Sequence, residues 1–454
     1  MFTSIKIEGW RQFRKVDINF HPRLTVLTGA NGAGKTTLLT LISRHLGWGG
    51  NFIGTPQDRN SSGHIKYSAD TWKMDDITES IDISEKTEGA DKLSDDSWTE
   101  EALVLIAARL LETQRAAKLA SRFDGPMTTI GSIGYESGIM AKLQTPLEVG
   151  QQYDVTINGQ QPVEGVHIPS HRTIFSYQQI QNIPTVPRRR NDVFNQYVNI
   201  LRQRLAGGNT QWSPQYYMKE TLIALAMFGY GNEAVMADPD SKILFEDFQE
   251  VLRKMLPPTL GFEKLLIQSP EVMLQTKTGT FSIDSLSGGA SAVVDLAWQI
   301  FMFQPSSSRF VVTLDEPENH LHPALQRRVL SDLMSAFPDV QFVVATHSPF
   351  IVGSAPDSSV YVLAYDEDSS VSSSKLARAN KAGSANDILR DVLGVDITIP
   401  IWAENQIQAV VKKYSEKDFD KAALTELKND LAFMGMGGQI PDAIASVVAA
   451  KDKK

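Results

Sequence analysis

A glycine-rich stretch near the N-terminus constrains the fold of this chain more than any other feature. The segment GANGAGKT, Gly29 to Thr36, fits the pattern G-x-x-x-x-G-K-[ST]. It follows the short apolar run LTVLT, Leu24 to Thr28, and precedes the helix-forming sequence KTTLLTLISRHL. A strand that turns through glycines into a helix places backbone N–H groups and a helix N-terminus around a phosphate. We therefore expect a phosphate-binding loop here.

The residue types of this loop predict ATP and Mg²⁺ as its ligands. Lys35 is expected to reach the β- and γ-phosphates, and the Thr36 hydroxyl is expected to hold Mg²⁺. The predicted nucleotide-binding residues of the loop are Gly29, Asn31, Gly32, Gly34, Lys35, Thr36 and Thr37.

A second motif supplies the carboxylates that ATP hydrolysis needs. FVVTLDE, Phe310 to Glu316, is an apolar run that ends in Asp315 and Glu316. At the end of a buried strand, Asp315 would hold Mg²⁺ and Glu316 would polarise the attacking water as a general base. The next apolar run, VQFVVATHS, follows the predicted helix PALQRRVLSDLMSAF. This order predicts a βαβ unit.

His347 stands at the tip of that second predicted strand, where a parallel sheet presents ligand-contacting groups. We expect it to hydrogen-bond the γ-phosphate or the attacking water. A capping or core histidine is the alternative interpretation.

The segment DSLSGGAS, residues 284 to 291, resembles a second phosphate site. Ser287, Gly288 and Gly289 precede a predicted helix from Ala290 to about Phe303. A serine hydroxyl beside free backbone N–H groups at a helix start binds anions, but the same residues also make an ordinary helix cap. The residues alone favour neither interpretation.

Composition limits the remaining possibilities. The chain has 454 residues, 42% of them hydrophobic, a formal net charge of −9 and no cysteine. Disulfides and thiolate metal sites are therefore excluded, and we expect a cytoplasmic location. No apolar run approaches the roughly 18 to 20 residues that span a bilayer, so no membrane association is expected.

Taken in this order, the phosphate loop, LSGG, the strand ending in Asp-Glu and the later histidine resemble an ABC-type ATPase. The resemblance implies an α/β fold with a mixed sheet flanked by helices, a β-lobe, a helical lobe and a small helical C-terminal tail. It also implies head-to-tail dimers or higher oligomers. Gly29 to Thr36 would bind ATP within its own subunit, whereas Ser287, Gly288 and Gly289 would contact the nucleotide of another subunit.

The finer resemblance is to the OLD, RecF and SMC-like group, whose members act on DNA or govern nucleases. It rests on LDEPENHLHP and on the opening IEGWRQFRKVDINF. The long stretch between Lys35 and Ser287 also distinguishes the chain from transporter subunits. Two departures are visible, because Ala290 replaces the usual glutamine or glutamate of the signature and His322 stands where a loop aspartate is usual.

The resemblance further implies a glutamine that contacts the nucleotide and its metal. IFSYQQIQ offers Gln178 and Gln179, and Arg172 lies just before it. We favour Gln178 because it directly follows an apolar run.

Several expectations concern the regions around the motifs. We expect a solvated acidic loop at residues 75–101, a long helix from Trp98 to Phe123, short strands up to about residue 170 and mostly helix from Asn191 to about Met273. YDEDSSVSSSK is expected to be a loop. The predicted regions are an ATPase core (1–45 and 280–400), an insert with the β-lobe (46–190), a helical lobe (191–279) and a tail (401–454).

Residues after His347 lack the glutamate-glycine and paired-aspartate pattern of a TOPRIM nuclease. The chain therefore resembles the stand-alone ATPases of the Septu and PARIS antiphage systems. This resemblance implies slow ATP hydrolysis, control of a separately encoded effector nuclease, and DNA or a phage protein as a trigger. The alternative is a RecF-like DNA-repair ATPase, in which Arg188, Arg189 and Arg190 contact phosphates or simply lie in a solvated loop.

Overall fold

The protein is described by a computed structural model that covers four main stretches of the chain, residues 1–59, 64–71, 127–377 and 401–452. Within these stretches residues 147, 172–176, 186–187, 304, 307–308, 416–420 and 438–439 are not described, and positions 385, 388 and 389 are described singly. The predicted acidic loop and the predicted helix from Trp98 to Phe123 lie outside the described residues. Across the described stretches, no helix has both the length and the apolar character required to cross a bilayer.

A mixed sheet of eleven strands forms the centre of the larger unit, Met1–Ala385. Its parallel part contains β3 (Leu24–Gly29), β15 (Phe310–Asp315), β16 (Val340–Ala345) and β17 (Ser359–Tyr365). β3 pairs with β16 on one side and β17 on the other, and β15 follows β16. Every residue of β3, β15 and β16 is buried, as their continuous apolar sequences predict for central parallel strands.

Antiparallel strands extend the same sheet. The opening segment forms β1 (Phe2–Trp10) and β2 (Phe13–Asn19), as predicted, and Ile5 pairs with Ile18. β7 (Met127–Tyr135), β8 (Met140–Pro146) and β10 (Thr156–Asn158) continue beyond β1. At the opposite edge β11 (Gly165–Ile168) pairs with β15 and is parallel to it. Two small two-stranded antiparallel sheets complete this region, β4 (Phe52–Ile53) with β9 (Gln152–Tyr153) and β5 (Thr55–Arg59) with β6 (Ile65–Ser68).

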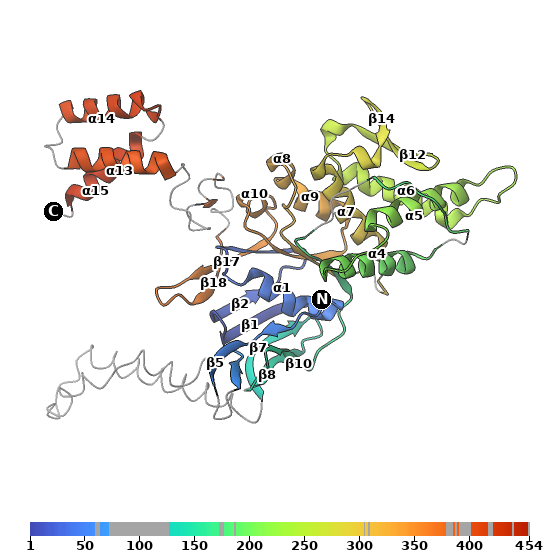
Figure 1. Cartoon of the computed structure of the whole chain (residues 1–454), viewed down its shortest axis with the longest axis horizontal. Coiled ribbons are helices and arrows are strands. Elements are labelled where there is room, and N and C mark those ends of the chain that lie inside the picture. Colours follow the sequence, from blue (N-terminus) through green and yellow to red (C-terminus); the bar gives the residue numbers. More distant parts are fainter. Residues whose placement is uncertain are drawn as a thin grey trace. The chain divides into compact units, whose positions relative to one another are not determined.

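The helices fall into two groups around this sheet. α1 (Lys35–Ser43), followed by η1 (Arg44–Leu46), contacts β3, β15 and β16. Figure 1 shows α4 (Arg190–Leu205), α5 (Pro214–Tyr230) and α6 (Pro239–Met255) grouped beside α7 (Gly288–Met302). The mixed sheet flanked by helices confirms the predicted fold class.

Three local expectations are wrong. The expectation of mostly helix from Asn191 to about Met273 holds up to Met255 but is wrong beyond it, because residues 262–282 form the antiparallel strands β12 (Phe262–Gln268), β13 (Glu271–Thr276) and β14 (Gly279–Ser282). β13 buries every second residue, which is the period of a strand and not of a helix. The predicted helix PALQRRVLSDLMSAF is broken into α8 (Pro323–Gln326) and α9 (Val329–Ala336) at Arg328, whose φ is −124°. Neither glycine nor proline marks that break in the sequence.

The third wrong expectation is the serine-rich loop, because its second half is the strand β18 (Val371–Lys375). The Asp366 carboxylate accepts hydrogen bonds from the backbone N–H groups of Asp368 and Ser370 and so fixes the turn. β18 then pairs with β17 and β2 and buries Val371. Backbone pairing therefore overrides the loop-like composition.

The C-terminal residues form a separate helical unit, Asn386–Lys454. Its helices are α13 (Ile401–Ser415), α14 (Lys421–Phe433) and α15 (Ile440–Asp452). They pack around a core of their own that includes Tyr414, Leu427 and Val447. The helical tail is therefore present as expected.

Candidate nucleotide-binding site

The phosphate loop joins β3 to α1 and depends on its glycines. Gly29 has φ +140°, and a Cβ atom added there would lie 2.2 Å from the Leu363 carbonyl oxygen. Gly34 has φ +90°, and an added Cβ would lie 2.3 Å from the Phe13 ring. Because both positions combine left-handed backbone with close neighbours, only glycine fits them without distortion.

Lys35 lies over this loop with its side chain turned back onto it. Its Nζ donates hydrogen bonds to the carbonyl oxygens of Gly29 at 2.9 Å and Ala30 at 3.0 Å. Burial lowers the pKa of Lys35, while the nearby carboxylates of Glu316, Asp315 and Glu318 oppose that shift. The Lys35 ammonium group therefore lies near the three carboxylates that follow one another at the end of β15.

Thr36 and Asp315 bring the two sequence motifs together. The Thr36 hydroxyl lies 3.2 Å and 3.4 Å from the two carboxylate oxygens of Asp315. The pKa of Asp315 is raised to about 6, chiefly by burial; the acidic neighbours Glu316 and Glu318 add to the increase, while Thr36 and Lys35 oppose it. A hydroxyl and a carboxylate in contact are oxygen donors of the kind that Mg²⁺ binds, so this pair fits the predicted metal.

Glu316 is held in an uncommon backbone conformation at the end of β15. Its φ is +47°, and its N–H donates to the Ala345 carbonyl at 2.8 Å. His347 Nδ1 lies 3.1 Å from Glu316 Oε1, and Asn319 Nδ2 donates to Glu316 Oε2 at 3.1 Å. Both oxygens of the predicted base are therefore oriented by neighbours. The structure brings His347 to Glu316, and the expected contact of His347 with the γ-phosphate or the attacking water stays a prediction.

Two residues of the LDEPEN segment, Glu318 and Asn319, help to shape the site, although the sequence alone predicted no role for them. Glu318 is 5% exposed, and its Oε1 accepts hydrogen bonds from the Thr346 hydroxyl at 2.6 Å and from His347 N–H at 3.1 Å. Asn319 Nδ2 also donates to the Ser170 carbonyl at 3.1 Å. Both residues belong to a motif that is visible in the sequence. Their hydrogen-bond partners lie just after the ends of β16 and β11 and could not be identified from the sequence.

The second phosphate-like motif begins helix α7. The Ser287 hydroxyl accepts a hydrogen bond from Ala290 N–H at 3.4 Å, and Ser287 and Gly288 are exposed. Gly289 faces the segment at His320, because a Cβ added to it would lie 3.2 Å from the His320 carbonyl oxygen. Ser287 is thus a helix cap in the single chain, and its exposed position leaves the predicted contact with another subunit's nucleotide as a prediction.

Gln178 lies against the start of α5. Its Oε1 accepts a hydrogen bond from Ser213 N–H at 2.9 Å, and its carbonyl accepts one from Lys219 Nζ at 2.7 Å. The alternative Arg172 lies outside the described residues, and Gln179 is exposed. These hydrogen bonds of Gln178 join it to the start of α5, not to Thr36 or Asp315, and its predicted role in binding nucleotide and metal stays a prediction.

The three arginines of the basic segment differ in their surroundings. Arg188 pairs with Glu220 at 3.1 Å and also contacts Gln196. Arg190 donates to the Phe301 carbonyl and lies over the Phe301 ring. Only Arg189 of the three is exposed. Two of the three charges proposed for DNA contact are therefore engaged within the protein.

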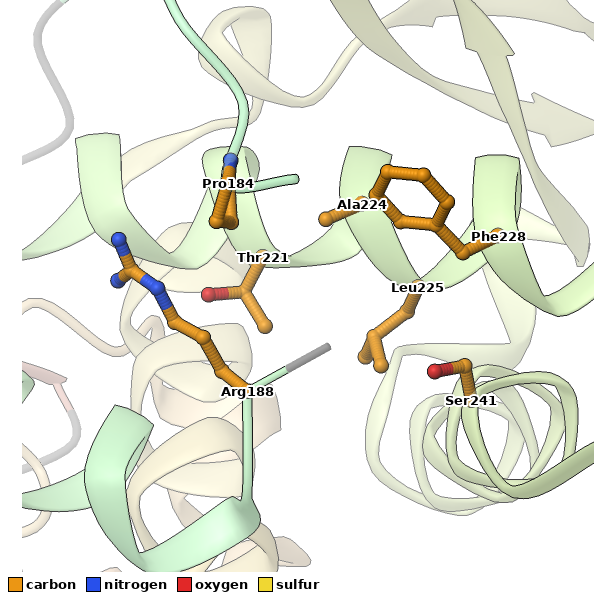
Figure 2. Close-up of a pocket in the computed structure, with 7 residues that line it drawn as sticks. All are labelled: Pro184, Arg188, Thr221, Ala224, Leu225, Phe228 and Ser241. Atoms are coloured by element: carbon orange, nitrogen blue, oxygen red, sulfur yellow. The ribbon is translucent and has the colours of Figure 1, made fainter. Parts of the chain in front are cut away.

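Arg188 also borders a small pocket between α5 and α6. Figure 2 shows its side chain beside Pro184 and Thr221, with Leu225 and Phe228 further along α5 and Ser241 on α6. The lining is mostly apolar and contains no residue of the phosphate loop, the Asp-Glu strand or the signature. This pocket is therefore distinct from the candidate nucleotide site.

Two family models match the segments that carry the site. One, described as "AAA domain", matches residues 4–114, and another, described as "AAA domain, putative AbiEii toxin, Type IV TA system", matches residues 257–353. The first range contains the phosphate loop, and the second contains the signature, the Asp-Glu strand and His347.

Named relatives are similar to parts of the chain. The Septu protein PtuA of Bacillus mycoides is 29% identical over 132 residues, which are 27% of this chain and 18% of that protein. The Septu protein PtuA of Bacillus thuringiensis is 24% identical over 192 residues, 39% of this chain and 48% of that protein. The Retron Ec83 probable ATPase of Escherichia coli is 25% identical over 126 residues, 25% of this chain and 23% of that protein. Each match spans less than half of the relative's length.

Among solved structures, the SMC head domain from Thermotoga maritima aligns with 83% of this chain and 99% of its own, with a TM-score of 0.40 and 12% identity. The central sheet, the phosphate loop and the Asp-Glu strand have the arrangement of a P-loop ATPase, and both matching family models are described as AAA domains. The Septu and retron relatives confirm its resemblance to the stand-alone ATPases of antiphage defence.

The raised pKa of Asp315 predicts a pH-dependent stability. The folded state holds the Asp315 proton more tightly than the unfolded chain does. The contribution of this proton to the free energy of unfolding is therefore fully present below the unfolded pKa near 4 and is lost as the pH rises through about 6. Asp315→Asn should therefore stabilise the nucleotide-free protein by about 1 to 3 kcal/mol at pH 7.5 and by much less at pH 4.5. Thermal or urea unfolding across this range measures the difference.

Asp357→Asn is the matched control, since its side chain is 89% exposed. Equal stabilisation by Asp315→Asn at both pH values would contradict the assignment of a buried, protonation-sensitive carboxyl.

Proposed function

We propose that this protein binds and slowly hydrolyses ATP in head-to-tail dimers or higher oligomers and thereby controls a separately encoded effector nuclease. The observation that carries the proposal is the contact of Thr36 with Asp315, beside Lys35 and next to the oriented Glu316. A metal-holding pair, a phosphate-binding cation and a general base are the parts that phosphoryl transfer to water requires.

The residues present fit ATP and Mg²⁺. The N–H groups of the loop and of the α1 N-terminus would face the phosphates, and Lys35 would exchange its two loop carbonyls for phosphate oxygens. Thr36 and Asp315 would hold Mg²⁺, which neutralises phosphate charge when bound. The positive charge would also lower the pKa of Asp315 and keep it ionised at neutral pH.

Glu316 is the residue best placed to accept a proton from the attacking water. Asn319 and His347 each contact a different carboxylate oxygen, so the side chain is fixed before substrate binds. Glu318 in turn holds the His347 backbone and the Thr346 hydroxyl. His347 would therefore reach the γ-phosphate or the water while it keeps Glu316 oriented.

Completion of the site by a second subunit is supported by the exposed start of α7. Ser287 and Gly288 are accessible, and their helix N-terminus offers N–H groups and a favourable dipole to an anion. A single chain that already has a phosphate loop has no need of this second site for its own ATP. We infer that it covers the nucleotide of another copy.

A cytoplasmic role in bacterial antiphage defence is proposed on the basis of the relatives. The PtuA proteins and the retron ATPase match segments of this chain, and we extend their context to it. DNA or a phage protein is proposed as the trigger.

Lys35→Ala should abolish ATP binding and hydrolysis, because it removes the cation that faces the phosphates. Glu316→Gln should retain ATP binding, lower turnover by about a hundredfold or more and trap an ATP-bound dimer. Fluorescent-nucleotide titration, phosphate release and light scattering measure the three quantities. Glu233→Gln, at an exposed loop position, is the control. Turnover of Glu316→Gln at the parent rate would refute the base assignment.

Ser287→Asp tests the contact between subunits while it keeps a residue that caps helices well. The added negative charge should repel the partner's γ-phosphate, so the variant should bind ATP normally as a monomer and fail to dimerise. Ser287→Asn is the neutral capping control and should dimerise more strongly than the aspartate variant.

Mixing Ser287→Asp with Lys35→Ala subunits sharpens this test. Every head-to-tail dimer of one subunit of each variant has two sites. One site combines the intact phosphate loop of the Ser287→Asp subunit with the intact signature of the Lys35→Ala subunit, and the other site combines the two altered motifs. The mixture should therefore recover part of the ATPase activity that neither variant has alone. No recovery would argue against composite sites.

The proposed partner is tested by co-expression of the tagged chain with the products of its neighbouring genes. Co-purification of a nuclease whose activity changes with ATP is the expected result. A chain that purifies alone from this co-expression would argue against control of a separate nuclease, although the ATPase proposal would stand on the variants above.

A further inference from the structure

A buried lysine joins the candidate glutamine segment to the signature motif. Lys219, on α5, has a side chain that is 1% exposed, and its Nζ lies 2.6 Å from Asp284 Oδ2. The same Nζ donates to the Gln178 carbonyl at 2.7 Å, and it lies 5.4 Å from the centre of the Tyr177 ring. One ammonium group therefore binds two segments that are far apart in the sequence.

Asp284 is the first residue of the DSLSGGAS segment and is buried with its partner. Its side chain is 6% exposed, and burial raises its pKa while the contact with Lys219 lowers it. Its other oxygen, Oδ1, is buried with no hydrogen-bond partner among the described residues. The carboxylate thus depends on Lys219, because a buried charge that loses its partner is strongly unfavourable.

Hydrogen bonds join the turn that carries Asp284 to the first turn of α7, on either side of the signature serine Ser287. Asp284 N–H donates to the Ser282 hydroxyl, Leu286 N–H donates to the Ile283 carbonyl, and the Ser291 hydroxyl donates to the Leu286 carbonyl. A displacement of Asp284 would therefore move the start of α7, where Ser287 is exposed.

The other side of the lysine faces a segment that is also anchored. Gln178 Oε1 accepts a hydrogen bond from Ser213 N–H at the start of α5, and the Tyr177 hydroxyl donates to Glu271 at 2.9 Å. The position of Lys219 is thus defined by α5, by the segment at Gln178 and by the signature turn together.

We propose that Lys219 is a positioning residue that holds the signature turn in the orientation required for one subunit to close over the ATP of another. It does so by bonding Asp284 and the Gln178 carbonyl at the same time, which ties the signature to the segment that would sense the nucleotide. The inference rests on the proposed ATP-driven dimer and assigns a residue to its control.

The decisive variant removes both charges together. Lys219→Met with Asp284→Leu leaves no unpaired buried charge, so the double variant should fold with near-parental thermal stability. It should bind Mg²⁺-ATP as a monomer with unchanged affinity, yet its ATP-driven dimerisation should weaken by about tenfold or more. Light scattering in the Glu316→Gln background and titration with fluorescent ATP provide these readouts.

Asp284→Asn is a second variant that keeps the size of the side chain and removes its charge. It should shift dimerisation in the same direction. Its ATP turnover in the parental background should recover as protein concentration rises, because association and not folding is limiting. Glu220→Gln is the matched control: it breaks the Arg188 ion pair at the next position of α5, and it should dimerise normally.

Dimerisation of the double variant at the parental affinity would overturn the inference. It would show that the ion pair between Lys219 and Asp284 has no role in dimerisation. Failure of the parental chain itself to dimerise with ATP would instead refute the proposed function, and this inference with it. Loss of dimerisation in Glu220→Gln as well would show that any disturbance of α5 has this effect and would also overturn a specific role for Lys219.

Discussion

The contact between the Thr36 hydroxyl and the Asp315 carboxylate is the interaction on which the site depends. It requires that β3 and β15 end at the same edge of the sheet, although the sheet places β16 between them. Parallel pairing of all three strands satisfies this requirement, and their complete burial keeps the edge fixed. The geometry of Lys35, Glu316 and His347 follows from that alignment.

This arrangement concentrates like charge. Asp315, Glu316 and Glu318 are three carboxylates at the end of β15 and directly after it, and Lys35 is the cation that offsets them. Burial of Asp315 opposes its ionisation and raises its pKa, which explains why the nucleotide-free site is electrostatically unfavourable. Binding of a divalent cation would relieve that repulsion. The repulsion among the carboxylates therefore both destabilises the nucleotide-free site and favours binding of the metal.

The sequence was sufficient for the parts of the site that are local. The phosphate loop, the Asp-Glu strand and His347 could be predicted because strand, turn and helix patterns are continuous there, and the structure brings Thr36, Asp315, Glu316 and His347 together. The contacts of Glu318 with Thr346 and of Lys219 with Asp284 could not be predicted, since each joins segments whose register is set by tertiary packing. Strand β18 was missed because pairing with β2 and β17, rather than composition, determines it.

The neighbours of β3 in the sheet also determine at what stage of chain synthesis the ATP site can form. Its two partners, β16 and β17, are synthesised far later than the phosphate loop that β3 carries, and Leu363 packs directly against Gly29. A chain emerging from the ribosome therefore holds an incomplete loop until most of it has been made. Truncated products that end before β16 lack the strands that align Thr36 with Asp315, so they would not compete with the full chain for nucleotide.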